Sequence, residues 1–126
     1  MAKKTSYKLQ PQDERIVHVF SELGMPKNLA KTLMYISHVD ECRSAEIERG
    51  ANLRQPEVSI AMQHLQDKGW IEKRDLKKKG KGRPVHIYSL KAPLPTIMKR
   101  FEQEKLREVE SVKKDLSSLR LLIEEK

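Results

Sequence analysis

The sequence predicts a mostly helical α+β protein that ends in one long helix. Between residues 12 and 68, apolar residues recur every three or four positions in four separate segments, which is typical of amphipathic helices. After Trp70 the pattern changes to two short alternating runs with basic residues between them, which indicates a β-hairpin. Two prolines follow, and the charged segment from residue 96 to about 124 is expected to form a single helix.

The boundaries of the first four helices follow from caps and helix breakers. Ser44 and Gln55 stand at positions suited to an N-cap, and Pro56 suits the first helical position. Gly24 and Gly69 suit the residue that follows a helix C-terminus. The helices are therefore expected at residues 12–23, 26–38, 45–50 and 56–68.

The predicted hairpin carries a concentration of positive charge between its strands. The first strand begins at Trp70 and Ile71, and in the second strand Val85 and Ile87 alternate with their neighbours. The basic residues between the strands are Lys77, Lys78, Lys79, Lys81 and Arg83. Such a segment either remains solvated as a run of charges or contacts a phosphate backbone, and that contact releases counterions from the nucleic acid. The pair of helices that precedes the hairpin favours phosphate contact.

The net charge also favours a polyanionic partner. The chain has 126 residues and a formal net charge of +8, which suits nucleic acid or an anionic membrane surface. Residues 1–92 carry 18 basic and 11 acidic side chains, whereas residues 93–126 carry 8 and 7. The polyanion-binding surface is therefore expected within the first 92 residues, and the tail is expected to have another role.

The order of helix, helix, short helix, turn, helix and hairpin is the layout of a winged helix-turn-helix domain. The segments RSAEIERGANLRQPEVSIAMQHLQDKGWIEKR and KKKGKGRPVHIYSL resemble winged-helix transcriptional regulators of the MarR, ArsR and TrmB kind, especially small archaeal ones. The resemblance covers roughly residues 12–92 and implies a regulator of transcription that binds double-stranded DNA. The expected parts are a flexible basic arm over 1–10, a winged helix-turn-helix domain over 11–92 and a C-terminal helix over 93–126.

The fourth helix has one apolar face and one outward face that suits the major groove. Glutamine pairs with adenine and arginine with guanine, and an apolar side chain meets the methyl group of thymine. Glu57, in the first turn, is interpreted as a residue that stabilises the start of the helix. Together with the basic residues of the hairpin, the predicted DNA-binding residues are Ser44, Arg54, Gln55, Pro56, Ser59, Ile60, Gln63, Lys77, Lys78, Lys79, Lys81 and Arg83.

The C-terminal helix carries a short apolar seam. Its clearest part follows steps of three and four residues, as the a and d positions of a coiled coil do, although the seam breaks at Lys105. Pairing with a second copy would bring two winged domains together at a palindromic site, and docking on the winged domain of the same chain is the alternative. The predicted dimerisation residues are Ile97, Phe101, Val109, Val112, Leu116, Leu119 and Ile123.

Other functions find little support in the sequence. The chain has one cysteine, and His38 with Cys42 falls short of a zinc signature, so neither a metal nor another cofactor is expected. No catalytic motif is discernible, and an enzyme is not expected. The N-terminus lacks an apolar leader and no run suits a membrane span, which predicts a cytoplasmic protein. The alternatives are a winged-helix protein-interaction module of a transcription or replication assembly and an RNA-binding protein; no residue cluster indicates an effector ligand.

Overall fold

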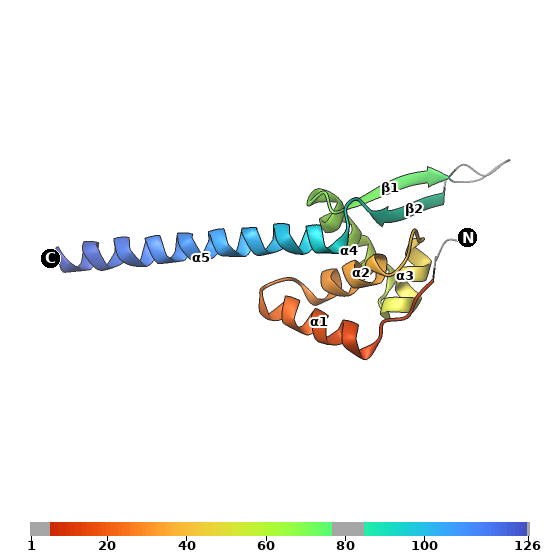
Figure 1. The fold of residues 1–126 in the computed structure, drawn as a ribbon, viewed down its shortest axis with the longest axis horizontal. Coiled ribbons are helices and arrows are strands. Elements are labelled where there is room, and N and C mark those ends of the chain that lie inside the picture. Colours follow the sequence, from red (N-terminus) through yellow and green to blue (C-terminus); the bar gives the residue numbers. More distant parts are fainter. Residues whose placement is uncertain (1–5, 77–84, 126) are drawn as a thin grey trace. The chain divides into compact units, whose positions relative to one another are not determined.

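The computed structural model describes residues 6–76 and 85–125. In chain order, the described elements are α1 (Pro11–Glu22), α2 (Lys27–Ser37), α3 (Ser44–Ala51), α4 (Gln55–Asp67), β1 (Ile71–Leu76), β2 (Val85–Leu90) and α5 (Leu94–Glu124) (Figure 1). The chain divides into two compact units, Met1–Leu94 and Pro95–Lys126. This element order is that of a mostly helical α+β winged helix-turn-helix fold with a long C-terminal helix, which confirms the predicted fold class.

The core of the first unit is built around α2. This helix contacts α1, α3, α4 and β2 (Figure 1), and all of its residues from Leu29 to Ile36 except Lys31 are buried. Such an apolar face suits a helix that is covered from several sides. The largest side chains that are fully buried in this unit are Trp70, Tyr35, Leu33, Ile36, Ile47, Leu65, Val17 and Val58.

The wing is a two-stranded antiparallel sheet that is joined to the helical core. Residues Ile71 and Leu76 pair with Leu90 and Val85 at the two ends of the register. The backbone of Cys42, just before α3, pairs with Tyr88 through N–H···O bonds of 2.9 and 2.8 Å. This extra bridge fixes β2 to the loop between α2 and α3, and no pattern in the sequence indicates it.

Two helices end at glycines, as their positions in the sequence indicated. Gly24 has a φ of 98° and Gly69 a φ of 75°, which is the left-handed conformation that follows many helix C-termini. At Gly69 the chain turns directly from α4 into β1, since the next residue, Trp70, already donates its N–H back to the carbonyl of Leu65 at 3.1 Å.

The starts of α3 and α4 differ by one residue from the prediction. Ser44 and Gln55 are the first helical residues, and the caps are Arg43 and Arg54. The reason is a glutamate three residues after each cap. The carboxylate of Glu46 accepts the N–H of Arg43 at 2.7 Å, and the carboxylate of Glu57 accepts the N–H of Arg54 at 2.8 Å, as in half of a capping box. The prediction of Ser44 and Gln55 as N-caps was therefore wrong.

The N-terminal segment is bound to the first unit from Tyr7 onward. The N–H of Tyr7 donates to the hydroxyl of Tyr35 at 3.2 Å, and the N–H of Leu9 donates to the carbonyl of Gly50 at 3.0 Å. A Cβ atom at Gly50 would overlap the ring of Tyr35 and the carbonyl oxygen of Tyr7, so a glycine is required where the segment crosses α3. The loose arm predicted for residues 1–10 does not extend over residues 7–10, and residues 1–5 lie outside the described part.

Candidate nucleic-acid interface

Helix α4 separates an apolar buried face from an exposed polar face. Its buried residues are Val58, Ala61, Met62 and Leu65, each at most 3% exposed. The outward residues are exposed, and Ile60 among them keeps 62% of its surface accessible. The predicted DNA-binding residues that share this accessible surface or its N-terminal end are Arg54, Gln55, Pro56, Ser59, Ile60 and Gln63.

The polar side chains on this face bond to one another along the helix. Gln55 Nε2 donates to Ser59 Oγ at 3.3 Å, and Gln63 Nε2 donates to Asp67 Oδ1 at 2.9 Å. Both pairs are exposed, so their hydrogen bonds compete with water and contribute little to stability. Asp67 lies on the same face as Gln63, which places a negative charge at the C-terminal end of this surface.

Glu57 fixes the N-terminal end of α4 through two contacts, of which the sequence indicated one. One carboxylate oxygen of Glu57 caps the helix at Arg54, which agrees with the interpretation of this residue as a helix-start stabiliser. The other accepts a hydrogen bond from Asn28 Nδ2 at 3.1 Å. Glu57 therefore also ties α4 to the beginning of α2.

The turn between α3 and α4 holds the two helices in contact. Asn52 adopts the left-handed conformation with a φ of 55°, which asparagine tolerates better than most residues. Leu53 then donates its N–H to the carbonyl of Glu48 at 3.0 Å. The hydroxyl-bearing Ser44, which was predicted to contact DNA, is exposed at the opposite end of α3.

The described base of the wing carries two pairs of polar side chains. Asp75 in β1 and His86 in β2 face each other, with 2.6 Å between Oδ1 and Nδ1. Arg74 in β1 pairs with Glu41 at 2.7 Å. The predicted phosphate-binding residues between the strands lie outside the described residues: Lys77, Lys78, Lys79, Lys81 and Arg83.

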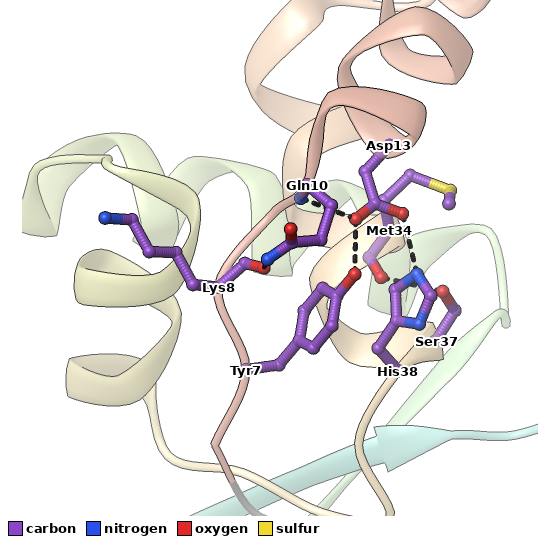
Figure 2. Close-up of polar contacts among 7 residues, drawn as sticks. All are labelled: Tyr7, Lys8, Gln10, Asp13, Met34, Ser37 and His38. Atoms are coloured by element: carbon purple, nitrogen blue, oxygen red, sulfur yellow. Dashed lines mark hydrogen bonds and ion pairs between the residues drawn. The ribbon is translucent and has the colours of Figure 1, made fainter.

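A polar cluster that the sequence did not indicate joins the N-terminal segment to α1 and α2. Figure 2 shows Tyr7, Gln10 and His38 converging on the carboxylate of Asp13. Tyr7 Oη donates to Asp13 Oδ2 at 2.5 Å, the N–H of Gln10 donates to the same oxygen at 2.8 Å, and His38 Nε2 lies 2.7 Å from Oδ1. The rings of Tyr7 and His38 stack with 4.2 Å between their centroids. Asp13 is 3% exposed, so the carboxylate is a buried centre of this cluster.

The cluster shifts the pKa values of its members in opposite directions. Burial alone would raise the pKa of Asp13, but the hydrogen bonds from Tyr7, the Gln10 N–H and His38 outweigh it and hold the pKa below its usual range. The hydrogen bond to Asp13, together with burial and the nearby negative charge, raises the pKa of Tyr7 to about 12. The cluster is therefore held with an ionised Asp13 and a neutral Tyr7 at neutral pH.

We expect the Asp13→Asn variant to unfold more easily than the wild type at pH 7, by about 2 kcal/mol, because a hydrogen bond to a buried charge is lost. A lowered pKa in the folded state stabilises the protein above the pKa of the unfolded chain, and this contribution disappears as pH falls through the folded value. The difference between the two proteins should therefore shrink below about pH 4. Urea unfolding at several pH values measures it.

The exposed Glu14 provides the control, because Glu14→Gln removes a charge from the same helical turn. We expect that variant to track the wild type across the pH range. A gap between wild type and Asp13→Asn that stayed constant down to pH 2 would contradict the assignment of the stabilising role to the ionised carboxylate.

Cys42 is buried, and its thiol is not suited to redox sensing. It is 1% exposed, and burial together with the carboxylates of Glu46 and Glu41 raises its pKa to about 12. Reactive cysteines need a substantial thiolate fraction and access to solvent. Among residues 6–76 and 85–125, no group of three or more His, Cys, Asp or Glu side chains is arranged to hold a metal ion.

The second unit is described by α5 alone. Two of the predicted dimerisation residues, Ile97 and Phe101, are 1% and 4% exposed. The other five, from Val109 to Ile123, are between 47% and 61% exposed. The apolar seam is thus accessible from Val109 to Ile123. No helix in the described part of the chain is both long and apolar enough to cross a membrane.

Comparisons with known proteins find several similar solved structures. No protein-family model and no curated protein matches the chain. The chain is similar to the structure of NMB1585, a MarR family regulator from Neisseria meningitidis, with 19% identity over 90% of this chain and 89% of that one and a TM-score of 0.46. It is also similar to Pex from Synechococcus sp. (strain PCC 7942), with 20% identity over 76% of this chain and 96% of that one and a TM-score of 0.44. Neither comparison assigns a role to a residue of this chain.

Proposed function

We propose that this protein is a transcriptional regulator that binds double-stranded DNA as a homodimer, with α4 in the major groove. The observation that carries the proposal is the outward face of α4, where Gln55, Ser59 and Gln63 are all exposed on a helix whose opposite face is completely buried. Uncharged side chains with donors and acceptors are what direct reading of base edges requires. The element order places this helix second in a helix-turn-helix, which is the position of a recognition helix.

The surface chemistry of α4 supports sequence-specific contacts. Among the residues that the structure describes, the amide groups of Gln55 and Gln63 bond to neighbouring exposed side chains, so these bonds can be exchanged for bonds to a base without exposing a buried group. Ile60 projects from the same surface with 62% of its area accessible, and apolar contact with a thymine methyl group would bury it. Arg54 stands at the N-terminal end, where base contacts of such helices concentrate.

Charge supports a contact with the phosphate backbone. The formal net charge of the chain is +8, and the wing sequence between β1 and β2 contributes five basic residues within seven positions. Cationic side chains that neutralise phosphates provide affinity without sequence preference. The proposed division of labour is therefore specificity from α4 and affinity from the wing.

A triple variant of α4 tests the proposal. We expect Gln55→Ala, Ser59→Ala and Gln63→Ala together to weaken binding to a selected DNA site roughly 50-fold, because contacts to base edges are lost. Binding to random duplex should change much less, since it depends on phosphates. The site is first selected from a pool of randomised duplexes with the wild-type protein, and fluorescence anisotropy then measures both affinities.

The chain offers a control of the same composition away from α4. Gln12, Gln103 and Ser111 are exposed on α1 and α5, and their replacement by alanine should leave both affinities unchanged. Failure to select any site, with negligible binding to duplex DNA at low salt, would refute the proposal and favour a protein-interaction module. Tighter binding to single-stranded RNA than to duplex DNA would favour an RNA-binding protein.

A further inference from the structure

The accessible part of the α5 seam has a defined heptad register. Steps of three, four, three and four residues lead from Val109 through Val112, Leu116 and Leu119 to Ile123. Val109, Leu116 and Ile123 therefore occupy position a, and Val112 and Leu119 occupy position d. All five are between 47% and 61% exposed, and they span roughly 21 Å of helix. A stripe of this kind on a long helix is stabilised by burial against another helix.

The charges beside the seam are sorted by sign. The charged residues at position g are Glu108 and Asp115, which are acidic, and those at position e are Lys113 and Arg120, which are basic; the third g position holds Leu122. All four charged residues are exposed. The ion pairs that α5 makes on its own surface at these residues, Lys105 with Glu108 at 3.1 Å and Glu110 with Lys113 at 3.7 Å, are solvent-exposed. Such pairs are weak, so they are readily replaced by pairs between helices.

The sorting of charges distinguishes the two ways in which a second copy can lie along α5. In a parallel pair, position g of one helix lies beside position e of the partner's following heptad. Glu108 then faces the partner's Lys113, and Asp115 faces the partner's Arg120, so twofold symmetry gives four attractive pairs. In an antiparallel pair, g lies beside g and e beside e, so acids face acids and bases face bases. Charge complementarity therefore favours the parallel arrangement.

We propose that α5 forms a parallel, in-register coiled coil with α5 of a second copy of this chain, through Val109, Val112, Leu116, Leu119 and Ile123. This inference deepens the homodimer of the proposed function and rests on it. Valine and isoleucine at two a positions and leucine at one d position follow the preference of two-stranded assemblies, whereas Leu116 at a and Val112 at d do not. A parallel coiled coil joins both winged domains to the same end of the paired helices, as two domains that read adjacent half-sites require.

Single cysteines at the two ends of the seam test the orientation in the full-length chain. In a parallel pair, Val109→Cys should form a disulfide with its own copy, and so should Ile123→Cys. A mixture of the two variants, one carrying a mass tag, should give no disulfide between positions 109 and 123. Mild oxidation followed by non-reducing electrophoresis measures this. Cys42, 1% exposed with a pKa raised to about 12 by burial, does not compete.

The control cysteine is Ser118→Cys, on the outer face of the helix at position c, which should remain unlinked. Disulfides that appear only between 109 and 123 in the mixture would overturn the proposal in favour of an antiparallel pair. A chain that is monomeric by sedimentation equilibrium and forms no disulfide would overturn both the coiled coil and the homodimer. Duplex binding by that monomer would leave the DNA-binding part of the proposed function standing.

A charge reversal tests the same orientation without cysteines. Glu108→Lys with Asp115→Lys turns four attractive pairs into repulsive ones in a parallel dimer, and we expect dimerisation to weaken roughly 100-fold at low salt. Mixing with a Lys113→Glu, Arg120→Glu variant should restore a dimer. The matched control, Glu110→Lys with Glu124→Lys, makes the same change of charge at position b and should have little effect. Equal weakening of both variants, or no weakening of either, would contradict the parallel pairing.

Discussion

Replacement of the five basic wing residues by alanine is expected to weaken binding to duplex DNA by roughly two to three orders of magnitude at about 0.1 M salt. The residues are Lys77, Lys78, Lys79, Lys81 and Arg83. Each phosphate that a cationic side chain neutralises releases counterions from the DNA, so each lost contact lowers both the affinity and its dependence on salt. The plot of log affinity against log salt should lose a slope of about 0.9 for each contact removed. Fluorescence anisotropy with a random duplex at three salt concentrations measures both quantities.

A control for the wing must remove the same charge from another part of the chain. Suitable exposed residues are Arg15, Lys99, Arg100, Arg107 and Lys114. Their replacement by alanine lowers the net charge equally, so any general electrostatic attraction falls to the same extent. We expect this control to keep most of its affinity and nearly all of its salt slope. Equal losses in the two variants would show that net charge, and not contact by the wing, provides the affinity.

Trp70→Ala is expected to destabilise the first unit by about 3–5 kcal/mol, because it removes a large buried side chain and leaves a cavity. Trp70 is 1% exposed and stands between the end of α4 and the start of β1. Its backbone bonds to Leu65 at 3.1 Å and to Lys91 at 2.9 Å, so it joins α4 to both strands of the wing. Small domains have only about 5–15 kcal/mol of stability, and the melting temperature should fall by roughly 15 °C or more.

Circular dichroism during thermal unfolding measures this loss, and Ile60→Ala is the matched control. Ile60 is also a large apolar residue in the same region, but 62% of its surface is exposed, so truncation should change stability by less than about 0.5 kcal/mol. The proposed role of Ile60 in base contact predicts that its variant weakens DNA binding instead. A Trp70→Ala protein that melts within a few degrees of the wild type would contradict the central packing role of this side chain.

The sequence determined the fold class and which face of α4 is buried. Spacing alone separated the buried Val58, Ala61, Met62 and Leu65 from the exposed Gln55, Ser59, Ile60 and Gln63, because a helix with 3.6 residues per turn leaves each residue on a fixed face. The sequence also indicated the glycines that end α1 and α4, because few residues other than glycine adopt the left-handed conformation that follows a helix. The accessible a and d positions of α5 follow from the same periodicity.

Helix starts were predicted less accurately, and the physical reason is local competition. Side-chain preference predicts Ser44 and Gln55 as caps. In the structure, Glu46 and Glu57 each accept the N–H of the arginine three positions earlier, which makes that arginine the cap. The repeated pattern of arginine followed three residues later by glutamate was present in both segments. This pattern is typical of a capping box and indicates both helix starts correctly.

Only the tertiary structure decided which distant residues meet. Tyr7 and His38 meet at the buried carboxylate of Asp13. Asn28 bonds to Glu57 across two helices, and Cys42 pairs with Tyr88 to fix the wing. Periodicity records how a segment relates to its own axis, whereas these contacts depend on how separate segments pack against α2. Burial determines the chemistry of two of these residues. The charge of Asp13 must be paired because its carboxylate is buried, and burial raises the pKa of the Cys42 thiol and shields it from solvent. The sequence by itself determined the faces of the elements, and packing determined the chemistry between them.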